Sequence, residues 1–530
     1  MRASSPPRAA TTAAELLARG AALFEAEDLS GALGTFEEGA RHFPDEWRFL
    51  CNAGTVLHRQ RRMGEALRRV NQALALAPTS LLLHHKLGTW LLELDQHEAA
   101  LRLFERAAAF PDAGLDGLLH LGVACLETKK IERALATIAR ALALAPESAE
   151  AHALHGMVLA VLGEREESDA ALRRALALDP ACAQAAYHLA RRGTALDPGP
   201  LRARLADPQL SAAIGSKLHF ALANLHDQRG EHAEAFTHFT RANALARRRW
   251  DPEQNSRHFD ALIALCHGEF FARGAPARGE AGPIFLVGLP RTGSTLLEQI
   301  LAAHPLVHAV GEHSQGLPRL ARELPRLRPG VRAFPAGLED LDAHDVERLA
   351  ESYRASLPPA PAPGLRSVDK LLANFQMLGL IARLFPDARV VDCRRDLRDC
   401  GLSSFFLDFQ RNELPWSYDL EHIARYYRDY ERLMAHWAEH LPLPVLAVPY
   451  EGLVAEPEAW TRRVLEFVGL PWDPLCLRHE RAQRPVFTAS ALQVRERPHA
   501  RALDRWKPYA PFLGPLAQFC PASESVTSLS

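Results

Sequence analysis

The amino-terminal third of the chain repeats with a period of about 34 residues. Glycines recur at that step and prolines follow them at similar steps: Gly20, Gly54, Gly88, Gly122 and Gly156, then Pro44, Pro78, Pro111, Pro146 and Pro180. Each proline closes a stretch with helical spacing of apolar residues and alanines, such as RALATIARALALAP, because proline cannot continue a helix. The period therefore predicts paired helices, with the second helix of each pair ending at the proline.

The period and the small residues resemble the tetratricopeptide repeat, a helix–turn–helix unit that buries its apolar face against its neighbours. On that resemblance, residues 13–190 form an all-α solenoid after a disordered segment at 1–12. A weaker repeat-like hairpin at 218–250 falls in a linking or capping region at 191–275. Such arrays present a concave surface, so we expect a protein or peptide ligand there rather than a plain spacer. The resemblance also allows a homodimer.

Composition limits the partners and the compartment. The chain carries 62 basic and 64 acidic side chains, so no global field favours nucleic acid or a membrane surface, and any anion site must be local. Its eight cysteines include no C-x-x-C pair, which favours reduced thiols and a cytoplasmic location. We find no signal-peptide core and no apolar run of membrane-spanning length, so we expect no membrane partner.

The pattern changes in the second half to short apolar runs that alternate with helices. The runs PIFLVG, ARVVDC and PVLAVP predict buried parallel strands of an α/β sheet. Ligands of such sheets bind beyond the carboxyl ends of the strands, so the loops after Val287, Cys393 and Val448 are expected to face one crevice. We assign residues 276–515 to this domain and 516–530 to a flexible tail.

The segment FLVGLPRTGSTLLEQILAAHP has the outline of a phosphate-binding loop without its lysine. Gly288 and Gly293 have the Walker separation, but Ser294 stands where the lysine belongs. The backbone amides of this loop, with the hydroxyls of Ser294 and Thr295, can hold a phosphate at a helix N-terminus. Arg291 offers a forked donor to an anion that arrives without a metal ion, so a magnesium nucleotide is disfavoured.

A second anion-binding segment, CRRDLRDCGLSSFF, starts at the end of the second predicted strand. Arg395 at the strand end and Ser403 on the next helix can hold a second phosphate. Asp392 could instead be a Walker-B carboxylate. We disfavour that interpretation because the loop lacks its lysine and two arginines follow soon after Asp392.

These two segments occur in the order found in sulfotransferases, where the first resembles the 5′-phosphosulfate loop and the second resembles the 3′-phosphate segment. The stretches YEGLVAEPEAWTRRVLEFVGLPWDP and TASALQVRERPHARALDRWKPY are also typical of tetratricopeptide-containing sulfotransferases, which are similar to protein-tyrosine sulfotransferases. The resemblance covers nearly the whole chain. It implies a P-loop-like sulfotransferase domain with a parallel sheet. It further implies transfer of a sulfuryl group from 3′-phosphoadenosine-5′-phosphosulfate to an acceptor hydroxyl, with no metal.

The resemblance also assigns roles to single residues. The catalytic residues that it implies are Glu312 as general base, Lys370 as the cation at the leaving phosphate, and Arg291 and Ser490 at the sulfuryl oxygens. The donor-binding residues that it implies are Arg291, Thr292, Gly293, Ser294, Thr295, Arg395, Ser403, Tyr450, Ser490, Gln493, Val494, Arg495 and Arg505. His313 is the rival base, because the ordinary pKa of imidazole suits neutral pH.

Several alternatives stay open. The protein-tyrosine enzymes carry a basic residue where this chain has Leu407, and they are membrane-anchored and luminal. The spacing of His436, Glu439 and His440 matches an inverted zinc-protease motif, which we interpret instead as an exposed helix face. The chain could also be an interaction scaffold that has lost catalysis, or a magnesium-dependent kinase. The acceptor is open among peptide tyrosine, a glycan and a hydroxylated metabolite.

Overall fold

The chain divides into two compact units, Met1–Val158 with Ala170–Cys182 and Leu159–Asp169 with Ala183–Ser530. The computed structural model describes residues 12–94, 96–110, 113–246, 248–272, 282–409, 414–481 and 503–519. The helices from residue 183 onward therefore belong to the same unit as the sheet. No helix among the described residues is long and apolar enough to cross a membrane.

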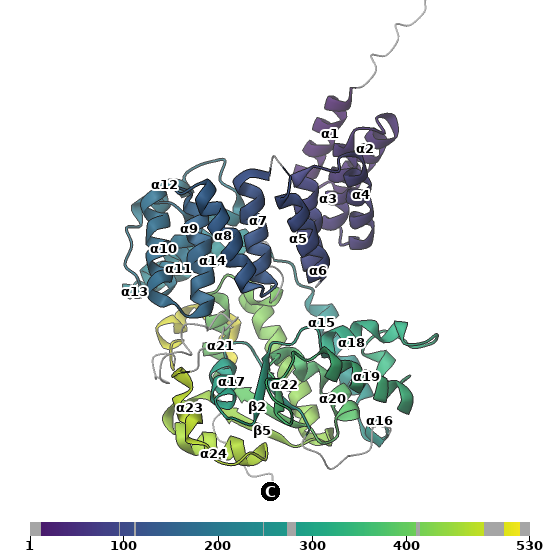
Figure 1. Ribbon diagram of the computed structural model, residues 1–530, viewed down its shortest axis with the longest axis vertical. Helices are drawn as coiled ribbons and strands as arrows, with labels where there is room; N and C mark the ends of the chain where they lie inside the picture. The colour runs from purple at the N-terminus through teal and green to yellow at the C-terminus, as the bar shows by residue number, and fades with distance from the viewer. Residues whose placement is uncertain are drawn as a thin grey trace, which may run out of the picture. The chain divides into compact units, whose positions relative to one another are not determined.

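Helical hairpins build the first unit, as the 34-residue period predicts (Figure 1). Helix α1 packs on α2, α3 packs on α4, and α5 packs on α6. The helices of this unit are α1 (Ala13–Glu25), α2 (Leu29–His42), α3 (Trp47–Arg59), α4 (Met63–Leu76), α5 (Leu81–Glu93), α6 (His97–Ala108), α7 (Gly114–Glu127) and α8 (Ile131–Leu144), and the helices α9 (Ala149–Leu162) and α10 (Arg165–Leu178) have residues in both units. The all-α solenoid is confirmed for the repeat region.

The periodic glycines mark the places where the two helices of a hairpin approach closely. A Cβ atom on Gly54 in α3 would lie 2.6 Å from Cγ2 of Val70 in α4. One on Gly88 in α5 would lie 2.6 Å from Cζ of Phe104 in α6. Protein interiors are close-packed, so neither site has room for a side chain. The glycine period is thus a packing requirement.

Further helices precede the sheet in the second unit. They are α11 (Ala183–Arg191), α12 (Gly199–Leu205), α13 (Ala212–Gln228), α14 (His232–Ala246), α15 (Pro252–Leu265) and α16 (Gly268–Ala272). The hairpin of α13 and α14 packs against the end of α21 (Leu397–Phe405). The ring of Phe239 stacks on Phe406 with centroids 3.9 Å apart, and Asn243 Nδ2 donates to the carbonyl oxygen of Phe405 at 2.9 Å. These contacts anchor the helix that carries Ser403.

The described part of the second unit holds a five-stranded sheet in the order β2-β3-β1-β4-β5. The strands are β1 (Ile284–Gly288), β2 (Val307–Gly311), β3 (Arg366–Asp369), β4 (Arg389–Arg394) and β5 (Val445–Pro449). All neighbouring strands are parallel. The three predicted strands are confirmed as β1, β4 and β5. Strands β2 and β3, with the sequences VHAVG and RSVD, are short and interrupted by polar residues, so their patterns did not stand out.

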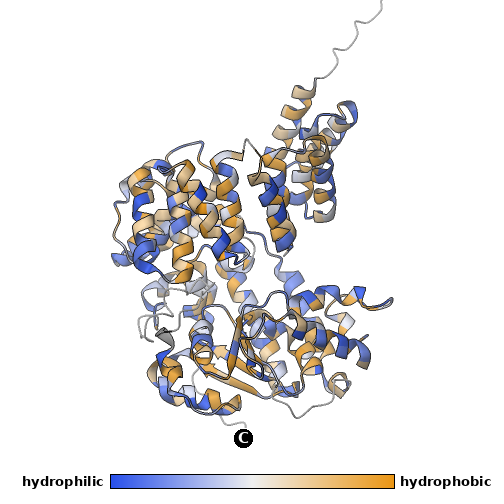
Figure 2. Ribbon diagram, viewed as in Figure 1, coloured by the Kyte–Doolittle hydropathy of each residue, from blue (hydrophilic) through white to orange (hydrophobic). Residues whose placement is uncertain are grey.

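Helices after residue 282 complete this unit. They are α17 (Ser294–Ala302), α18 (Leu317–Glu323), α19 (Ala343–Ser356), α20 (Leu378–Leu384), α21, α22 (Leu420–His440), α23 (Tyr450–Ala455) and α24 (Pro457–Phe467). Every residue of β1 is buried, as expected of the central strand in a sheet covered on both faces. Figure 2 shows the strands mainly in hydrophobic colours. The polar residues described below lie where these strands end.

Candidate active site

A residue singled out from the sequence follows each of the five strands. Arg291 comes after β1, Glu312 after β2, Lys370 after β3, Arg395 after β4 and Tyr450 after β5. Parallel strands place their carboxyl ends at one edge of the sheet, so the topology brings these segments to one edge. Strand β1 lies at the centre, with β3 on one side and β4 on the other. The chain thus continues on opposite sides of β1, and open α/β sheets bind ligands at the point where the strand order reverses in this way.

The loop between β1 and α17 adopts a left-handed conformation at two positions. Arg291 has φ 70° and Gly293 has φ 83°. The left-handed region is uncommon for a residue other than glycine, so the backbone at Arg291 is strained. A Cβ atom on Gly293 would lie 2.3 Å from Cδ2 of Tyr450, so the loop touches the segment after β5. The loop leads into the N-terminus of α17, where backbone amides favour an anion.

Three predicted hydroxyl residues stand at the start of α17. Thr292, Ser294 and Thr295 are all buried. The Thr292 hydroxyl donates to the carbonyl oxygen of Leu289 at 2.8 Å, so it braces the loop. Ser294 and Thr295 belong to the first turn of the helix, where backbone N–H groups have no partner within the helix.

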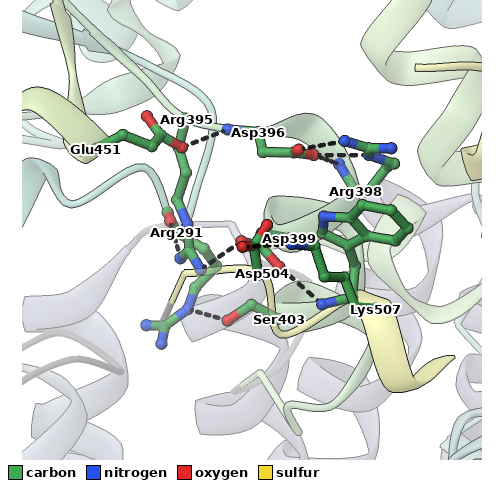
Figure 3. Close-up of polar contacts among 10 residues, drawn as sticks. Arg291, Arg395, Asp396, Arg398, Asp399, Ser403, Glu451, Asp504 and Lys507 are labelled. Atoms are coloured by element: carbon green, nitrogen blue, oxygen red, sulfur yellow. Dashed lines mark hydrogen bonds and ion pairs between the residues drawn. The ribbon is translucent and has the colours of Figure 1, made fainter. Parts of the chain in front are cut away.

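The two predicted anion-binding segments meet at Arg291 and Arg395 (Figure 3). Arg291 Nε donates to Ser403 Oγ at 2.9 Å, and Arg395 Nη1 donates to the backbone oxygen of Arg291 at 2.9 Å. Arg395 Nη2 also lies 3.4 Å from Asp399 Oδ2. The guanidinium of Arg395 stands over the ring of Tyr450, 5.1 Å from its centroid. Segments after β1, β4 and β5 thus form one contact network.

Positive charge gathers around Arg291. Burial, followed by the charges of Arg191, Arg395 and Arg505, lowers the pKa of Arg291 to about 9. Arg505 is held by Asp227 at the end of α13, with Arg505 Nη2 2.7 Å from Asp227 Oδ2. Like charges that repel one another at short range favour the binding of an anion, and a group with more than one negative charge most of all.

Lys370 and Glu312 form an ion pair at the ends of β3 and β2. Lys370 Nζ lies 2.5 Å from Glu312 Oε1, and the Lys370 backbone N–H donates to Gly311 at 3.0 Å. The side chain of Lys370 is 1% exposed, whereas that of Glu312 is 41% exposed. Burial lowers the pKa of Lys370, but the carboxylates of Glu312 and Glu298 outweigh it and the pKa is raised overall. The pair therefore joins a buried cation to a carboxylate that solvent can reach.

The rival base His313 has a different environment. Its Nε2 atom lies 2.9 Å from the hydroxyl oxygen of Ser356, and its ring packs edge-on against Tyr353 with centroids 5.9 Å apart. The side chain is buried. Glu312 is therefore the more accessible of the two candidate bases.

The two motifs considered for metal binding make other contacts. Asp392 is fully buried, where it accepts from the Tyr430 hydroxyl at 2.9 Å and from Arg394 Nε at 2.6 Å. His436 Nε2 lies 2.7 Å from the carbonyl oxygen of Cys266. These bonds give both residues a structural role. Among the described residues, no group of three or more His, Cys, Asp or Glu side chains is arranged to hold a metal ion.

Four predicted site residues, Ser490, Gln493, Val494 and Arg495, lie outside the described residues. Leu407, where the tyrosine enzymes carry a basic residue, is buried beside the aromatic contact of Phe406. A charged side chain would therefore be costly at this position without a partner.

Sequence reasoning missed three carboxylates that hold the predicted cations. Asp227 binds Arg505, Asp399 lies near Arg395, and Glu298 lies 3.8 Å from Lys370 Nζ. Two of them left a signal in the sequence, because Glu298 interrupts the apolar run TLLEQIL and Asp399 stands four residues after Arg395. Asp227 is identified only by the packing of distant segments.

Comparisons with known proteins agree with this architecture. A profile described as "Sulfotransferase family" matches residues 283–474, and profiles described as "Tetratricopeptide repeat" match residues 2–80, 91–158 and 149–182. An uncharacterized protein of Aquifex aeolicus is 29% identical over 322 residues, which are 58% of this chain and 41% of that protein.

Relatives named as protein-tyrosine sulfotransferases also match the chain. Protein-tyrosine sulfotransferase 1 of Danio rerio is 31% identical over 211 residues, which are 37% of this chain and 56% of the relative. Protein-tyrosine sulfotransferase of Drosophila melanogaster is 27% identical over 213 residues, 37% of this chain and 40% of the relative. The chain thus spans between 40% and 56% of the length of these three relatives. Residues 283–474 are a sulfotransferase-family domain, and in this chain tetratricopeptide repeats precede it.

Proposed function

We propose that this chain transfers a sulfuryl group from 3′-phosphoadenosine-5′-phosphosulfate to an acceptor hydroxyl without a metal ion. The observation that carries the proposal is the meeting of a lysine-free loop, an arginine cluster and a Lys–Glu pair at one edge of a parallel sheet. The sulfotransferase-family match and the named relatives support the same class of reaction.

The donor fits the charge pattern around Arg291. The α17 N-terminus and the hydroxyls of Ser294 and Thr295 would hold the 5′-phosphosulfate. Arg395 and Ser403 would hold the 3′-phosphate, and Arg505 would reach a phosphate from the other side of the arginine cluster. Fixed guanidinium groups replace the magnesium ion that a nucleotide triphosphate site uses. The roles of Ser490, Gln493, Val494 and Arg495 at the donor stay predictions.

Side chains of this chain can accept the proton and stabilise the charges that the transfer produces. Glu312 would take the proton from the acceptor hydroxyl as the acceptor oxygen forms a bond to sulfur. The bond between sulfur and the bridging oxygen breaks, and its electron pair stays on the leaving 5′-phosphate. Lys370 would stabilise that developing charge, and Arg291 would stabilise the sulfuryl oxygens, both as fixed cations. We favour Glu312 over His313 because Glu312 is the more exposed and contacts Lys370.

Peptide tyrosine is the first acceptor class to test, because the named relatives are protein-tyrosine sulfotransferases. A glycan or a hydroxylated metabolite is the second. We further propose that the repeats bind a protein or peptide ligand on their concave face, which could be the acceptor itself. The homodimer and the cytoplasmic location stay predictions.

A transfer assay tests the proposal. The full chain is incubated with sulfur-labelled donor and a cell lysate, with magnesium in one arm and EDTA in the other. Label is expected to move to an acceptor in both arms, and mass spectrometry should find a gain of one SO3 group. Peptides that differ only in tyrosine or phenylalanine then test the acceptor class.

The rival functions predict different results in the same assay. A kinase would need magnesium and would transfer a phosphoryl group from a nucleotide triphosphate. An inactive scaffold would transfer nothing and would not bind the donor. Either result would overturn the proposal.

A further inference from the structure

A second carboxylate, Glu298, stands beside the Lys370–Glu312 pair. It belongs to α17, the helix that begins at the proposed donor loop. Its Oε2 atom lies 3.8 Å from Nζ of Lys370, and its Oε1 atom would lie 3.8 Å from a Cβ atom on Gly311. Since Gly311 directly precedes Glu312, three segments converge on one buried ammonium group. That group is flanked by carboxylates from two different elements.

The two carboxylates differ in what they can reach. The side chain of Glu298 is 7% exposed, compared with 41% for Glu312. Glu312 can therefore meet an incoming hydroxyl, whereas Glu298 can act only on enclosed neighbours. A general base loses its charge when it takes a proton, so Glu312 then ceases to be a counterion. A buried ammonium group without a counterion is costly and tends to lose its proton.

We propose that Glu298 is a positioning residue that holds Lys370 in place and protonated while Glu312 takes the acceptor proton. The inference rests on the proposed sulfuryl transfer. The acceptor proton moves to Glu312. Lys370 keeps its own proton and offers an N–H to the bridging oxygen, where the electron pair of the broken S–O bond settles. Glu298 stays ionised throughout and supplies the negative charge that Glu312 has given up.

Of the residues that the structure describes, the other titratable groups around Lys370 do not take over this role. Burial raises the pKa of the Cys393 thiol, so it stays neutral. Burial also raises the pKa of Asp369 to about 7, and the charge of Glu298 contributes to that rise. At neutral pH, the carboxylates that raise the pKa of Lys370 are those of Glu312 and Glu298. Of these, Glu298 is the one enclosed beside Lys370.

Carbon NMR of the lysine side chains gives a readout that needs no turnover. The chain has six lysines, so protein labelled with 13C at lysine Cε gives few signals, and Lys370→Arg identifies the one of interest. In the wild-type protein, the Lys370 signal should keep its cationic shift to higher pH than an unperturbed lysine side chain does. In Glu298→Gln, the Lys370 signal should titrate at lower pH than in the wild-type protein.

The matched control is Glu323→Gln. Glu323 forms an ion pair of 2.8 Å with Arg319 on the partly exposed helix α18, so the substitution removes a paired carboxylate away from Lys370. The Lys370 titration should not change in this variant. A thermal unfolding curve of each variant shows whether the fold persists.

Kinetics separate positioning from mere packing. Glu298→Gln should lower kcat by about tenfold at alkaline pH, while KM for the donor changes by less than about twofold. The alkaline limb of the kcat profile should move to lower pH. Glu298→Asp keeps the charge and should recover part of the lost kcat.

The proposal is overturned if Lys370 titrates at the same pH in Glu298→Gln and wild-type protein. It is also overturned if wild-type Lys370 titrates like an unperturbed lysine side chain, a measurement that stands even when the variant does not fold. If the wild-type chain transfers no sulfuryl group, the proposed function fails. The NMR titration still tests separately whether Glu298 keeps Lys370 protonated.

Discussion

The contacts within the repeat array join residues that are near in sequence, whereas contacts within the sheet domain join residues that are far apart in sequence. In the array, a helix packs on the next one, as α3 packs on α4 a few residues later. In the sheet domain, Arg291 bonds to Ser403 and Lys370 bonds to Glu312, pairs that are 112 and 58 residues apart. The array can therefore be predicted from the sequence period, whereas the residues of the site come together only when the strands have assembled into the sheet.

Glycine shows the same contrast. Gly54 serves helix packing in the array, because a side chain there would meet Val70. Gly293 serves conformation in the loop after β1, because its φ of 83° is left-handed. The same residue type thus has a structural function in one unit and a proposed binding function in the other.

The largest effect is expected at Glu312. Glu312→Ala should lower kcat by about 10²- to 10⁴-fold, because the acceptor loses its general base. Affinity for adenosine 3′,5′-bisphosphate, measured by calorimetry, should stay the same or rise, since Lys370 loses a competing carboxylate. The control in the array is Glu93→Ala, which removes the partner of His58 at 2.8 Å and should leave kcat unchanged. Equal losses of kcat and affinity in Glu312→Ala would mean that Glu312 only shapes the pocket.

The second prediction concerns pH and the stability of the sheet domain. Burial raises the pKa of Asp369 to about 7, well above the value of about 4 for an unfolded carboxyl. The folded state therefore binds this proton more tightly, and the stability that it contributes is present below about pH 4 and is lost as the pH rises to about 7. The unfolding free energy of the wild type minus that of Asp369→Asn should therefore be larger at about pH 5 than at about pH 8.

Hydrogen exchange on peptides from β3 measures this difference where it arises. Peptides from α3 and α4 in the array serve as the internal control. A difference between the two proteins that is the same at both pH values would contradict the raised pKa.

The third prediction compares the two glycines directly. Gly293→Ala should weaken donor binding by about 10- to 100-fold, because the left-handed backbone and the Tyr450 ring leave no place for a methyl group. Gly54→Ala should instead lower the unfolding free energy of the array by about 1–3 kcal/mol through overpacking against Val70. Calorimetry of donor binding and urea unfolding should give opposite patterns for the two variants. Loss of donor affinity in Gly54→Ala would contradict the separation between a packing glycine in the array and a donor-binding glycine in the sheet domain.

The smallest effect is expected at Gly34 within α2. This glycine is exposed, and a Cβ atom there would have no neighbour within 4 Å. Gly34→Ala should raise the unfolding free energy of the array by about 0.5–1 kcal/mol through the better helix propensity of alanine. A lower unfolding free energy for Gly34→Ala, measured by urea unfolding, would contradict the open surroundings of Gly34.

The sequence predicts the array well because helix pairing and proline stops are local. It also predicts β1, β4 and β5, which are apolar enough to stand out, while the four residues of β3 are too few for a clear pattern. Glu312, Lys370 and Arg291 came from the family resemblance, and the structure places them after three neighbouring strands. The proposed domain boundaries stay predictions.

The carboxylates around the site were harder to predict. Glu298 lies near Lys370 only because α17 packs against β1 and β2. Asp227 reaches Arg505 across 278 residues of chain. Neither relation has a spacing rule, because both depend on how separate elements pack.

Binding of adenosine nucleotides to the full chain in EDTA tests the central claim most directly. We predict that adenosine 3′,5′-bisphosphate binds without a metal ion. Adenosine 5′-phosphosulfate, which lacks the 3′-phosphate, should bind more weakly, and the difference should shrink in Ser403→Ala. Equal affinity for both ligands in the wild-type protein, or binding only when magnesium is restored, would contradict a metal-free site built from Arg291, Arg395 and Ser403.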